Sequence, residues 1–134
     1  MSMFSIFSVS GSAISAQSQR LNVVASNLAN VDAVAGPDGQ AYKARQVVFQ
    51  TTPLGDDGAS GVRVSAINES EAPGRRVLDP NHPLADEQGY VTHSNVSAVD
   101  EMVNMISASR SYQNNVEVMN TAKSLLLKTL QMGQ

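Results

Sequence analysis

Large apolar residues recur at every seventh position along the first 31 residues, at Phe7, Ile14, Leu21 and Leu28. Val24 and Val31 interleave with this series and complete an a/d stripe of the kind that packs one helix against another. The other face is made of Ser, Gln, Asn and Ala, and Arg20 is its only charged side chain. A solvated amphipathic helix normally carries more charge. The pattern therefore predicts an N-terminal helix whose polar face does not meet open water.

A second helical pattern occupies the end of the chain, where apolar residues recur at three- and four-residue steps. These residues are Val99, Met102, Val103, Ile106, Tyr112, Val116, Met119, Leu126 and Leu130. Ser97 can cap the amide of Asp100 three residues later, and Asp100 and Glu101 would lie in the positively polarised first turn. We therefore predict a helix from about Ser97 to Leu130.

The segment between the two helices is rich in turn-forming residues. All five prolines and seven of the nine glycines lie between residues 36 and 89. Because Pro and Gly interrupt helices, the first helix should stop around residues 30–32, before the Gly-Pro-Asp-Gly turn at 36–39. This divides the chain into an N-terminal helix of a helical core (1–32), a Gly/Pro-rich β insert (33–94) and a C-terminal helix of the same core (95–134).

Four strands are predicted within the insert. Residues 42–51 and 61–68 favour strands joined by a hairpin loop at 53–58, and 76–78 and 90–93 are shorter candidates. We expect them to form one small antiparallel sheet.

The two helical segments span 31 and 34 residues, which corresponds to helices of roughly 46 and 51 Å. Matched lengths favour antiparallel packing, with both chain ends far from the sheet. The expected fold is mainly α with a small β insert (α+β), its long terminal helices paired as a coiled-coil-like hairpin. Such a pair alone would be loose as a monomer, because its apolar stripes do not offset the entropy of ordering both helices.

Composition excludes several classes of function. A net charge of -3 and a pI near 5.2 give no attraction to nucleic acid or to an anionic membrane. The absence of cysteine excludes disulfides and thiolate metal sites. No apolar run is long enough to cross a bilayer, so we expect no direct membrane span. The N-terminus has no positive n-region and its apolar residues are interrupted by serines, so it does not match a secretory signal peptide.

Two histidines, His82 and His93, lie near the acids Asp79 and Asp86. Their spacing matches no compact set of metal ligands, and a metal site needs three or four convergent ligands. The prolines that follow Asp79 and His82 more simply predict a rigid loop, because residues before proline are confined to extended geometry. No catalytic or phosphate-binding motif is present. We therefore expect no catalytic residue, no cofactor and no metal.

Several stretches carry a family resemblance. LNVVASNLANVD at residues 21–32 resembles the N-terminal signature of bacterial flagellar rod and hook proteins. The resemblance narrows to the short proximal-rod members through DPNHP at 79–83, GYV at 89–91, NV at 95–96, EMV at 101–103, ISASRSY at 106–112 and NVEVMNTAK at 115–123. Ala33 departs from the signature, which often has Thr at this position.

The resemblance implies a structural subunit of the rod, the periplasmic drive shaft that joins the motor ring in the membrane to the hook and transmits torque. It also implies delivery by the flagellar type III export apparatus without a cleaved signal peptide. The partners would be other proximal and distal rod proteins, membrane ring components and copies of the chain itself, stacked in a helical tube around a channel. The paired helices would form the inner tube and the insert the outer surface.

The residues expected at the assembly interface lie on the two helices: Leu21, Val24, Asn27, Leu28, Asn30, Tyr112, Val116, Met119, Leu126 and Leu130. Asn27 and Asn30 could fix the register between subunits as buried polar residues do in coiled coils, or could belong to a frayed helix end. Arg20 is expected at a subunit boundary, beside an acidic or carbonyl partner.

One alternative assigns the chain to a different class, a soluble coiled-coil adaptor that binds another helical protein. It predicts a stable small oligomer in solution, whereas the rod hypothesis predicts a mostly monomeric protein with labile termini. The serines near the start are open to two interpretations as well, a flexible export signal or an ordinary weak helix start.

Overall fold

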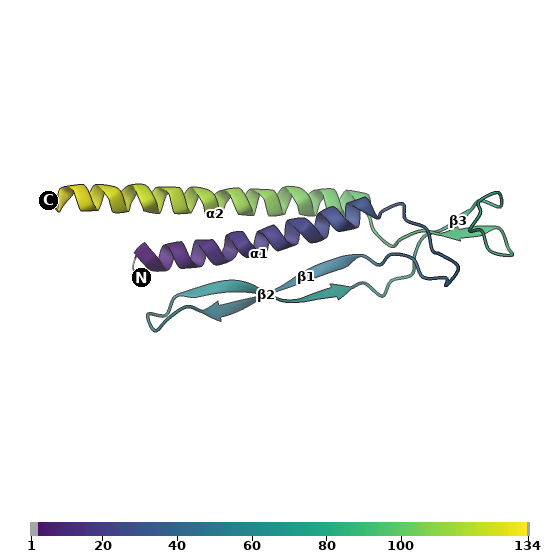
Figure 1. Cartoon of the computed structure of the whole chain (residues 1–134), viewed down its shortest axis with the longest axis horizontal. Helices are drawn as coiled ribbons and strands as arrows, with labels where there is room; N and C mark the ends of the chain where they lie inside the picture. Colours follow the sequence, from purple (N-terminus) through teal and green to yellow (C-terminus); the bar gives the residue numbers. More distant parts are fainter. Residues whose placement is uncertain (1–2, 134) are drawn as a thin grey trace.

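The computed structural model describes residues 3–133 and is elongated, with three parallel layers (Figure 1). Its elements in chain order are α1 (Met3–Ala29), β1 (Arg45–Pro53), β2 (Ser60–Glu69), β3 (Arg76–Leu78), β4 (Tyr90–Thr92) and α2 (Ala98–Met132). The two terminal helices run antiparallel and pack together, which confirms the predicted α+β class. Within the described residues the predicted helix and strand boundaries agree with these to within three residues, and the predicted helix start at residues 1–2 and the chain end at residue 134 lie outside that range.

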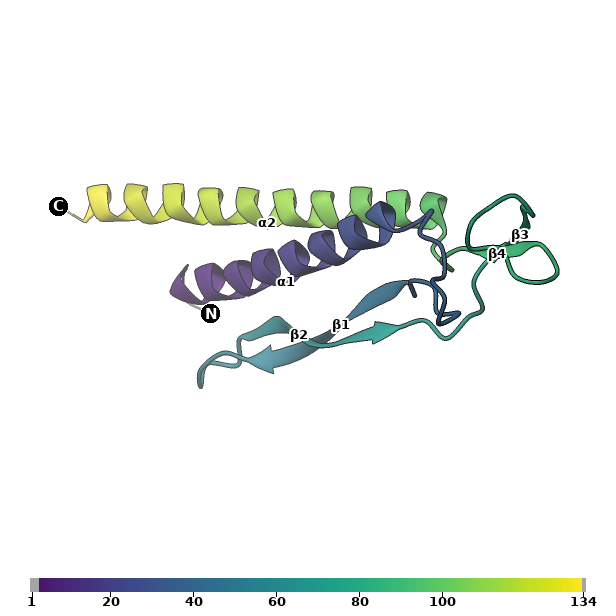
Figure 2. The same cartoon turned by 45° about the vertical axis from the view of Figure 1, so that its right-hand side comes forward.

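Helix α1 is the middle layer, between α2 on one side and the β1–β2 hairpin on the other (Figure 2). Its buried residues are Ser10, Ala16, Val24 and Asn27. Because both sides of α1 are covered by the same chain, charged side chains there would lose their hydration without gaining partners. This explains why α1 carries a single charged residue without requiring a neighbouring subunit.

Helix α2 packs only on α1 among the elements that the structure describes. Its buried and half-buried positions follow alternating steps of four and three residues, at Ala108, Tyr112, Asn115, Met119, Ala122 and Leu126. Ala108 is 0% exposed and Ala122 is 4% exposed. Small side chains at the centre of the contact let the two helix backbones approach closely.

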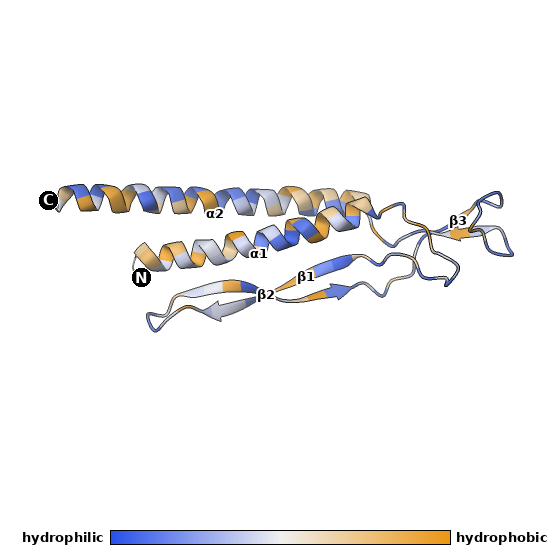
Figure 3. Ribbon diagram, in the orientation of Figure 1, coloured by the Kyte–Doolittle hydropathy of each residue, from blue (hydrophilic) through white to orange (hydrophobic). Residues whose placement is uncertain are grey.

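The stripe predicted for α2 is only partly correct. Tyr112, Met119 and Leu126 lie in the contact with α1, but the N-terminal members of the predicted stripe and Leu130 are exposed. Figure 3 shows hydrophobic residues recurring along the whole length of α2. Steps of three and four residues are compatible with two different faces of one helix, and only one of these faces meets α1.

The four strands form two separate two-stranded sheets, so the prediction of one sheet was wrong. β1 and β2 are antiparallel from Arg45↔Glu69 to Pro53↔Ser60, with a register shift between Val48 and Phe49. β3 and β4 form a shorter pair. Pro73 lies between β2 and β3 and separates the two sheets, because proline cannot donate a ladder hydrogen bond.

The β1–β2 hairpin folds back along α1, so its loop lies near the start of α1. The Ser5 hydroxyl donates to Asp57 Oδ2 at 2.5 Å, across 52 residues of sequence. This hydrogen bond, with a smaller contribution from the Ala59 amide, holds the pKa of Asp57 below its usual range. The expectation that both chain ends lie far from the sheet was therefore wrong for the N-terminal end. The hairpin returns because alternate apolar residues of its strands, among them Val47 and Phe49, are half-buried on this side.

A glycine allows the closest approach of the hairpin to α1. A Cβ atom on Gly61 would lie 2.6 Å from Ser12 Oγ and 2.8 Å from Leu54 Cδ1. The neighbouring Val62 amide donates to the same Ser12 hydroxyl at 3.1 Å. Only a residue without a side chain fits between strand and helix here.

At the opposite end of the molecule, hydrogen bonds hold the loop between β3 and β4, and its rigidity stays a prediction. Asp86 Oδ1 accepts from the amides of Gln88 and Tyr90 at 2.9 and 2.8 Å. Its Oδ2 accepts from Arg76 at 3.0 Å. These contacts, the Tyr90 amide first, lower the pKa of Asp86. His82 Nδ1 accepts from the Leu84 amide at 3.0 Å. No helix within residues 3–133 is long and apolar enough to cross a membrane.

We expect Gly61→Ala to destabilise the chain by about 1–3 kcal/mol, because the added methyl group pushes the hairpin away from Ser12. Gly11→Ala is the matched control, since its Cβ would meet nothing within 4 Å. Removing a glycine from a helix interior should raise stability by about 0.5–1 kcal/mol. Thermal unfolding followed by circular dichroism measures both, and an unchanged or raised melting temperature for Gly61→Ala would contradict the close approach.

Asp86 should make the β3–β4 loop sensitive to acid. Its pKa is lowered by folding, so its contribution to stability is fully present above the unfolded pKa of about 3.9 and is lost as the pH falls through the lower folded value. Carboxyl chemical shifts followed by NMR should give a midpoint below that of an unfolded peptide. Arg76→Gln should retain part of the shift, because the Tyr90 amide still donates. A midpoint at or above 3.9 is incompatible with these contacts.

Candidate assembly surface

The C-terminal end of α1 is closed by its own polar side chains. The Asn30 side-chain amide donates to the Ser26 carbonyl at 2.9 Å, and the Asn30 main-chain amide also donates to that carbonyl, at 3.2 Å. Carbonyls in the last turn of a helix lack intrahelical partners, so these bonds satisfy one of them. The Asn30 side-chain amide is thus used within its own helix end.

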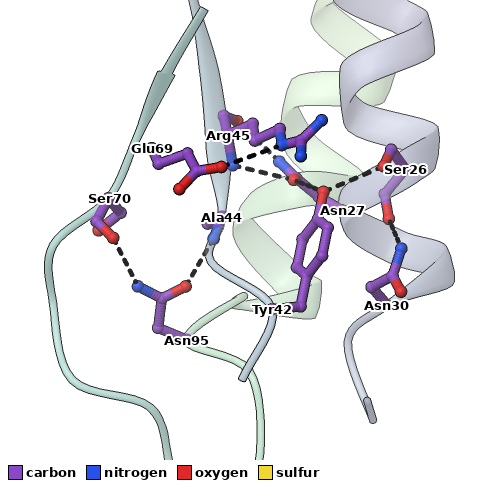
Figure 4. A network of polar contacts seen from close by, with 9 residues as sticks. All are labelled: Ser26, Asn27, Asn30, Tyr42, Ala44, Arg45, Glu69, Ser70 and Asn95. Carbon is purple, nitrogen blue, oxygen red and sulfur yellow. Dashed lines mark hydrogen bonds and ion pairs between the residues drawn. The ribbon is translucent and has the colours of Figure 1, made fainter. Parts of the chain in front are cut away.

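Asn27 ties α1 to the first residue of β1 (Figure 4). Its Nδ2 donates to the Arg45 carbonyl at 2.8 Å, and its Oδ1 accepts from the Arg45 amide at 3.0 Å. The Tyr42 hydroxyl donates to the same Oδ1 at 2.8 Å. The Asn27 carboxamide thus pairs with both main-chain groups of Arg45, much as a neighbouring strand would. The Asn27 side chain is completely buried, and it fixes the position of the hairpin on the helix.

Asn95 holds the same strand from the other side, in the segment that leads into α2. Its Oδ1 accepts from the Ala44 amide at 2.6 Å, and its Nδ2 donates to the carbonyls of Ser70 and Ala72 at 3.3 and 2.9 Å. We call Asn27, Tyr42, Arg45 and Asn95 the polar junction. It joins the end of α1, the base of the hairpin and the start of α2. Asn95 was not predicted as a site residue, and the sequence marks it only by its place in the NV pair of the family resemblance.

The residues predicted for the assembly interface lie mostly inside the single chain. Val24 is 3% exposed and Asn27 is 0% exposed, so the structure places both in the interior. Half-buried positions are occupied by Leu21, Leu28, Asn30, Tyr112, Val116, Met119 and Leu126. Only Leu130 is largely exposed, at 58%. Most of this set therefore builds the fold, and its role between subunits stays a prediction.

Arg20 has a carbonyl partner, as predicted, but this partner belongs to the same chain. Its guanidinium donates to Asn104 Oδ1 at 3.3 Å and to Ser107 Oγ at 3.5 Å, both on α2. It also donates to Gln17 Oε1 at 3.3 Å. In this structure Arg20 lies at the boundary between α1 and α2.

The largest exposed apolar feature of the first half of α2 is a set of four residues at helical spacing, which we call the outer face. Val99, Met102, Val103 and Ile106 are 70%, 55%, 62% and 54% exposed. Val103 and Ile106 also line a shallow groove of about 340 Å³ with Ser107, Arg110 and Ser111. Contiguous exposed apolar residues of this kind mark interaction surfaces on soluble proteins.

The exposed positions of α1 differ in character from the outer face of α2. They include Ser8, Ser15, Asn22, Ala25 and Ala29, all uncharged and small or of moderate size. Such a surface lets another helix approach closely and leaves no charge to be desolvated. Within residues 3–133 no group of three His, Cys, Asp or Glu side chains could hold a metal ion.

Comparisons with known proteins agree on one family. The model described as "Flagella basal body rod protein" matches residues 7–37, and the model described as "Flagellar basal body rod FlgEFG protein C-terminal" matches residues 87–132. The chain is 60% identical to "Flagellar basal-body rod protein FlgC" of Yersinia enterocolitica and 58% identical to that of Escherichia coli O6:H1, over the whole of both chains in each case. The FlgC of Buchnera aphidicola from Acyrthosiphon pisum is 47% identical, again over all of both chains.

We expect Asn27→Ala to destabilise the isolated chain by about 2–4 kcal/mol, because it leaves both main-chain groups of Arg45 without their partner and removes one of the two partners of the Tyr42 hydroxyl. Asn22→Ala removes the same side chain from an exposed position of the same helix and should change stability by less than about 0.5 kcal/mol. Urea-induced unfolding measures both. Equal effects of the two substitutions would show that the polar junction contributes nothing to the fold.

Proposed function

Since this chain belongs to the FlgC family of flagellar basal-body rod proteins, we propose that it enters the rod by packing the outer face of α2 on helices of neighbouring subunits. The family makes the chain a structural subunit of the basal-body rod and not an enzyme. The exposure of Val99, Met102, Val103 and Ile106 is the observation that carries the proposal.

Covering the outer face would contribute favourable free energy to assembly. Burying a side chain such as Val, Ile or Met completely is worth about 1.5–3 kcal/mol. The four residues are each more than half exposed in the single chain, so covering them contributes on the order of 5 kcal/mol per subunit. The groove beside Ile106 gives a partner side chain a place to insert.

The surroundings of the outer face fit a tube of packed helices. The exposed positions of α1 carry no charge, so a neighbouring helix can lie against them without burying an unpaired ion. We propose that the helical core (1–32 and 95–134) lines the inner tube and that the insert (33–94) lies on its outer surface. The polar junction then transmits force between the two parts of each subunit.

We propose other proximal and distal rod proteins, membrane ring components and further copies of this chain as the partners. The same proposal places the subunit in the periplasmic part of the rod, where it transmits torque from motor to hook. We further propose export by the flagellar type III apparatus, which the family resemblance implies. An adaptor role predicts a stable small oligomer of the purified chain, whereas the proposed rod role predicts a mostly monomeric one.

We expect Ile106→Asp to abolish rod assembly and swarming while the purified chain stays folded, since this side chain is 54% exposed before assembly. Val103→Asp, one turn away, should behave in the same way. Ile106→Leu preserves the apolar surface and is the matched control. Leu28→Asp and Leu126→Asp should also prevent assembly with the hairpin still formed, but with a lower melting temperature because both positions are half-buried.

Swarming on soft agar, the recovery of basal bodies and circular dichroism of the purified variants together measure these effects. Normal swarming of the Ile106→Asp strain would refute the outer face as an assembly surface.

A further inference from the structure

A cleft of about 310 Å³ opens where α1, α2 and β1 meet, and the outer face of α2 does not contribute to it. Its apolar lining comes from Val23, Val24, Val47 and Phe49. Glu101, in the first turn of α2, also lines it. Arg20, Arg45, Gln46 and Asn104 complete the lining, so Glu101 is the one carboxylate in a cleft that is partly apolar and partly polar.

The Glu101 carboxylate lacks the partners that a buried charge needs. The residue is only 6% exposed, and its Oε2 atom has no hydrogen-bond partner among the residues that the structure describes. Its position in the first turn of α2 places it favourably in the field of the helix, but this effect is weaker than the loss of hydration. The isolated chain thus keeps a carboxylate in an unfavourable environment.

The two arginines that line the same cleft do not pair with Glu101. Arg20 donates to Asn104 and Ser107, which lie about one and two turns beyond Glu101 along α2. Arg45 is paired with Glu69, with 3.6 Å between Nε and Oε1. The charge of Glu101 is therefore available to form an ion pair with a group of another chain.

We infer that this cleft receives a lysine or arginine side chain of a neighbouring rod subunit, whose cationic group pairs with Glu101. The inference rests on the proposed rod function and adds a second, charged contact to the outer face. The long aliphatic stem of such a side chain packs on Val24, Val47 and Phe49, while its terminal N–H groups reach the carboxylate. A water molecule can donate a hydrogen bond to Glu101 but does not neutralise its charge. Donor side chains shorter than lysine or arginine do not fill the cleft.

Without this contact the unpaired charge of Glu101 destabilises the free subunit. With it, the paired charge stabilises the assembled rod. Replacing an unpaired buried charge by an apolar side chain of similar size is neutral or stabilising, whereas removing one member of a formed ion pair is disruptive. Stability of the free chain and assembly of the rod should therefore respond to the same substitution in opposite directions.

The test compares Glu101→Met and Glu101→Gln with Asp100→Asn, which neutralises the adjacent, exposed acid. We expect both Glu101 variants to melt at or above the temperature of the unmodified chain, and swarming and basal-body recovery to fall at least tenfold. Glu101→Asp, which retains the charge one methylene shorter, should restore part of the assembly. Asp100→Asn should leave swarming and basal-body recovery unchanged.

Two results would overturn the inference. A melting temperature lowered by several degrees in both Glu101 variants, and equally in Arg20→Gln, would place the partner of Glu101 within the chain. Normal assembly of Glu101→Met would show that no neighbouring cation uses the cleft. The proposed rod function is tested separately by Ile106→Asp. It can therefore hold even when the inference about the cleft is wrong, and the two outcomes are distinguishable.

Discussion

The pairing of the Asn27 carboxamide with the main chain of Arg45 is the contact on which the rest of the architecture depends. It fixes where the chain, after leaving α1 and a loop of fifteen residues between Ala29 and Arg45, begins the strand that returns along the helix. Asn95 holds the adjacent Ala44 from the segment that leads into α2. Three parts of the chain that are distant in sequence thus meet at one buried, hydrogen-bonded point, where a missing partner would be costly.

This arrangement gives the two helices different tasks. α1 is covered by α2 and by the hairpin, and its Ser12 and Asn27 side chains bind the hairpin within the single subunit. α2 is covered on one side only, and its remaining apolar residues are available to neighbours. The subunit therefore has one helix that organises it and one that can connect it to the rod. A structural protein of the flagellar basal-body rod needs both, because each subunit must hold its own fold and also present a surface to its neighbours.

The sequence predicted both helices, the Ser97 cap and the strand positions, because periodicity and turn residues act locally. It did not predict that the hairpin lies along α1, since the alternation of apolar and polar residues at 62–66 shows that a face is buried but not what buries it. The α2 stripe failed for the same reason: Ile106 and Tyr112 both fit helical spacing, yet only Tyr112 faces α1. Asn27 and Glu101 were recognised as polar residues in helices, while their burial depends on contacts with segments far along the chain.

The most direct test of the central claim is amide hydrogen exchange of the purified, unassembled chain, measured residue by residue by NMR. The Ala44 and Arg45 amides are held by the side-chain oxygens of Asn95 and Asn27, so both should exchange far more slowly than the exposed amides of the loop at residues 55–58. Their protection should approach that of the centre of the β1–β2 ladder. Exchange of both amides at the rate of an unfolded chain, while the centre of α2 stays protected, would show that the polar junction does not form in a single subunit.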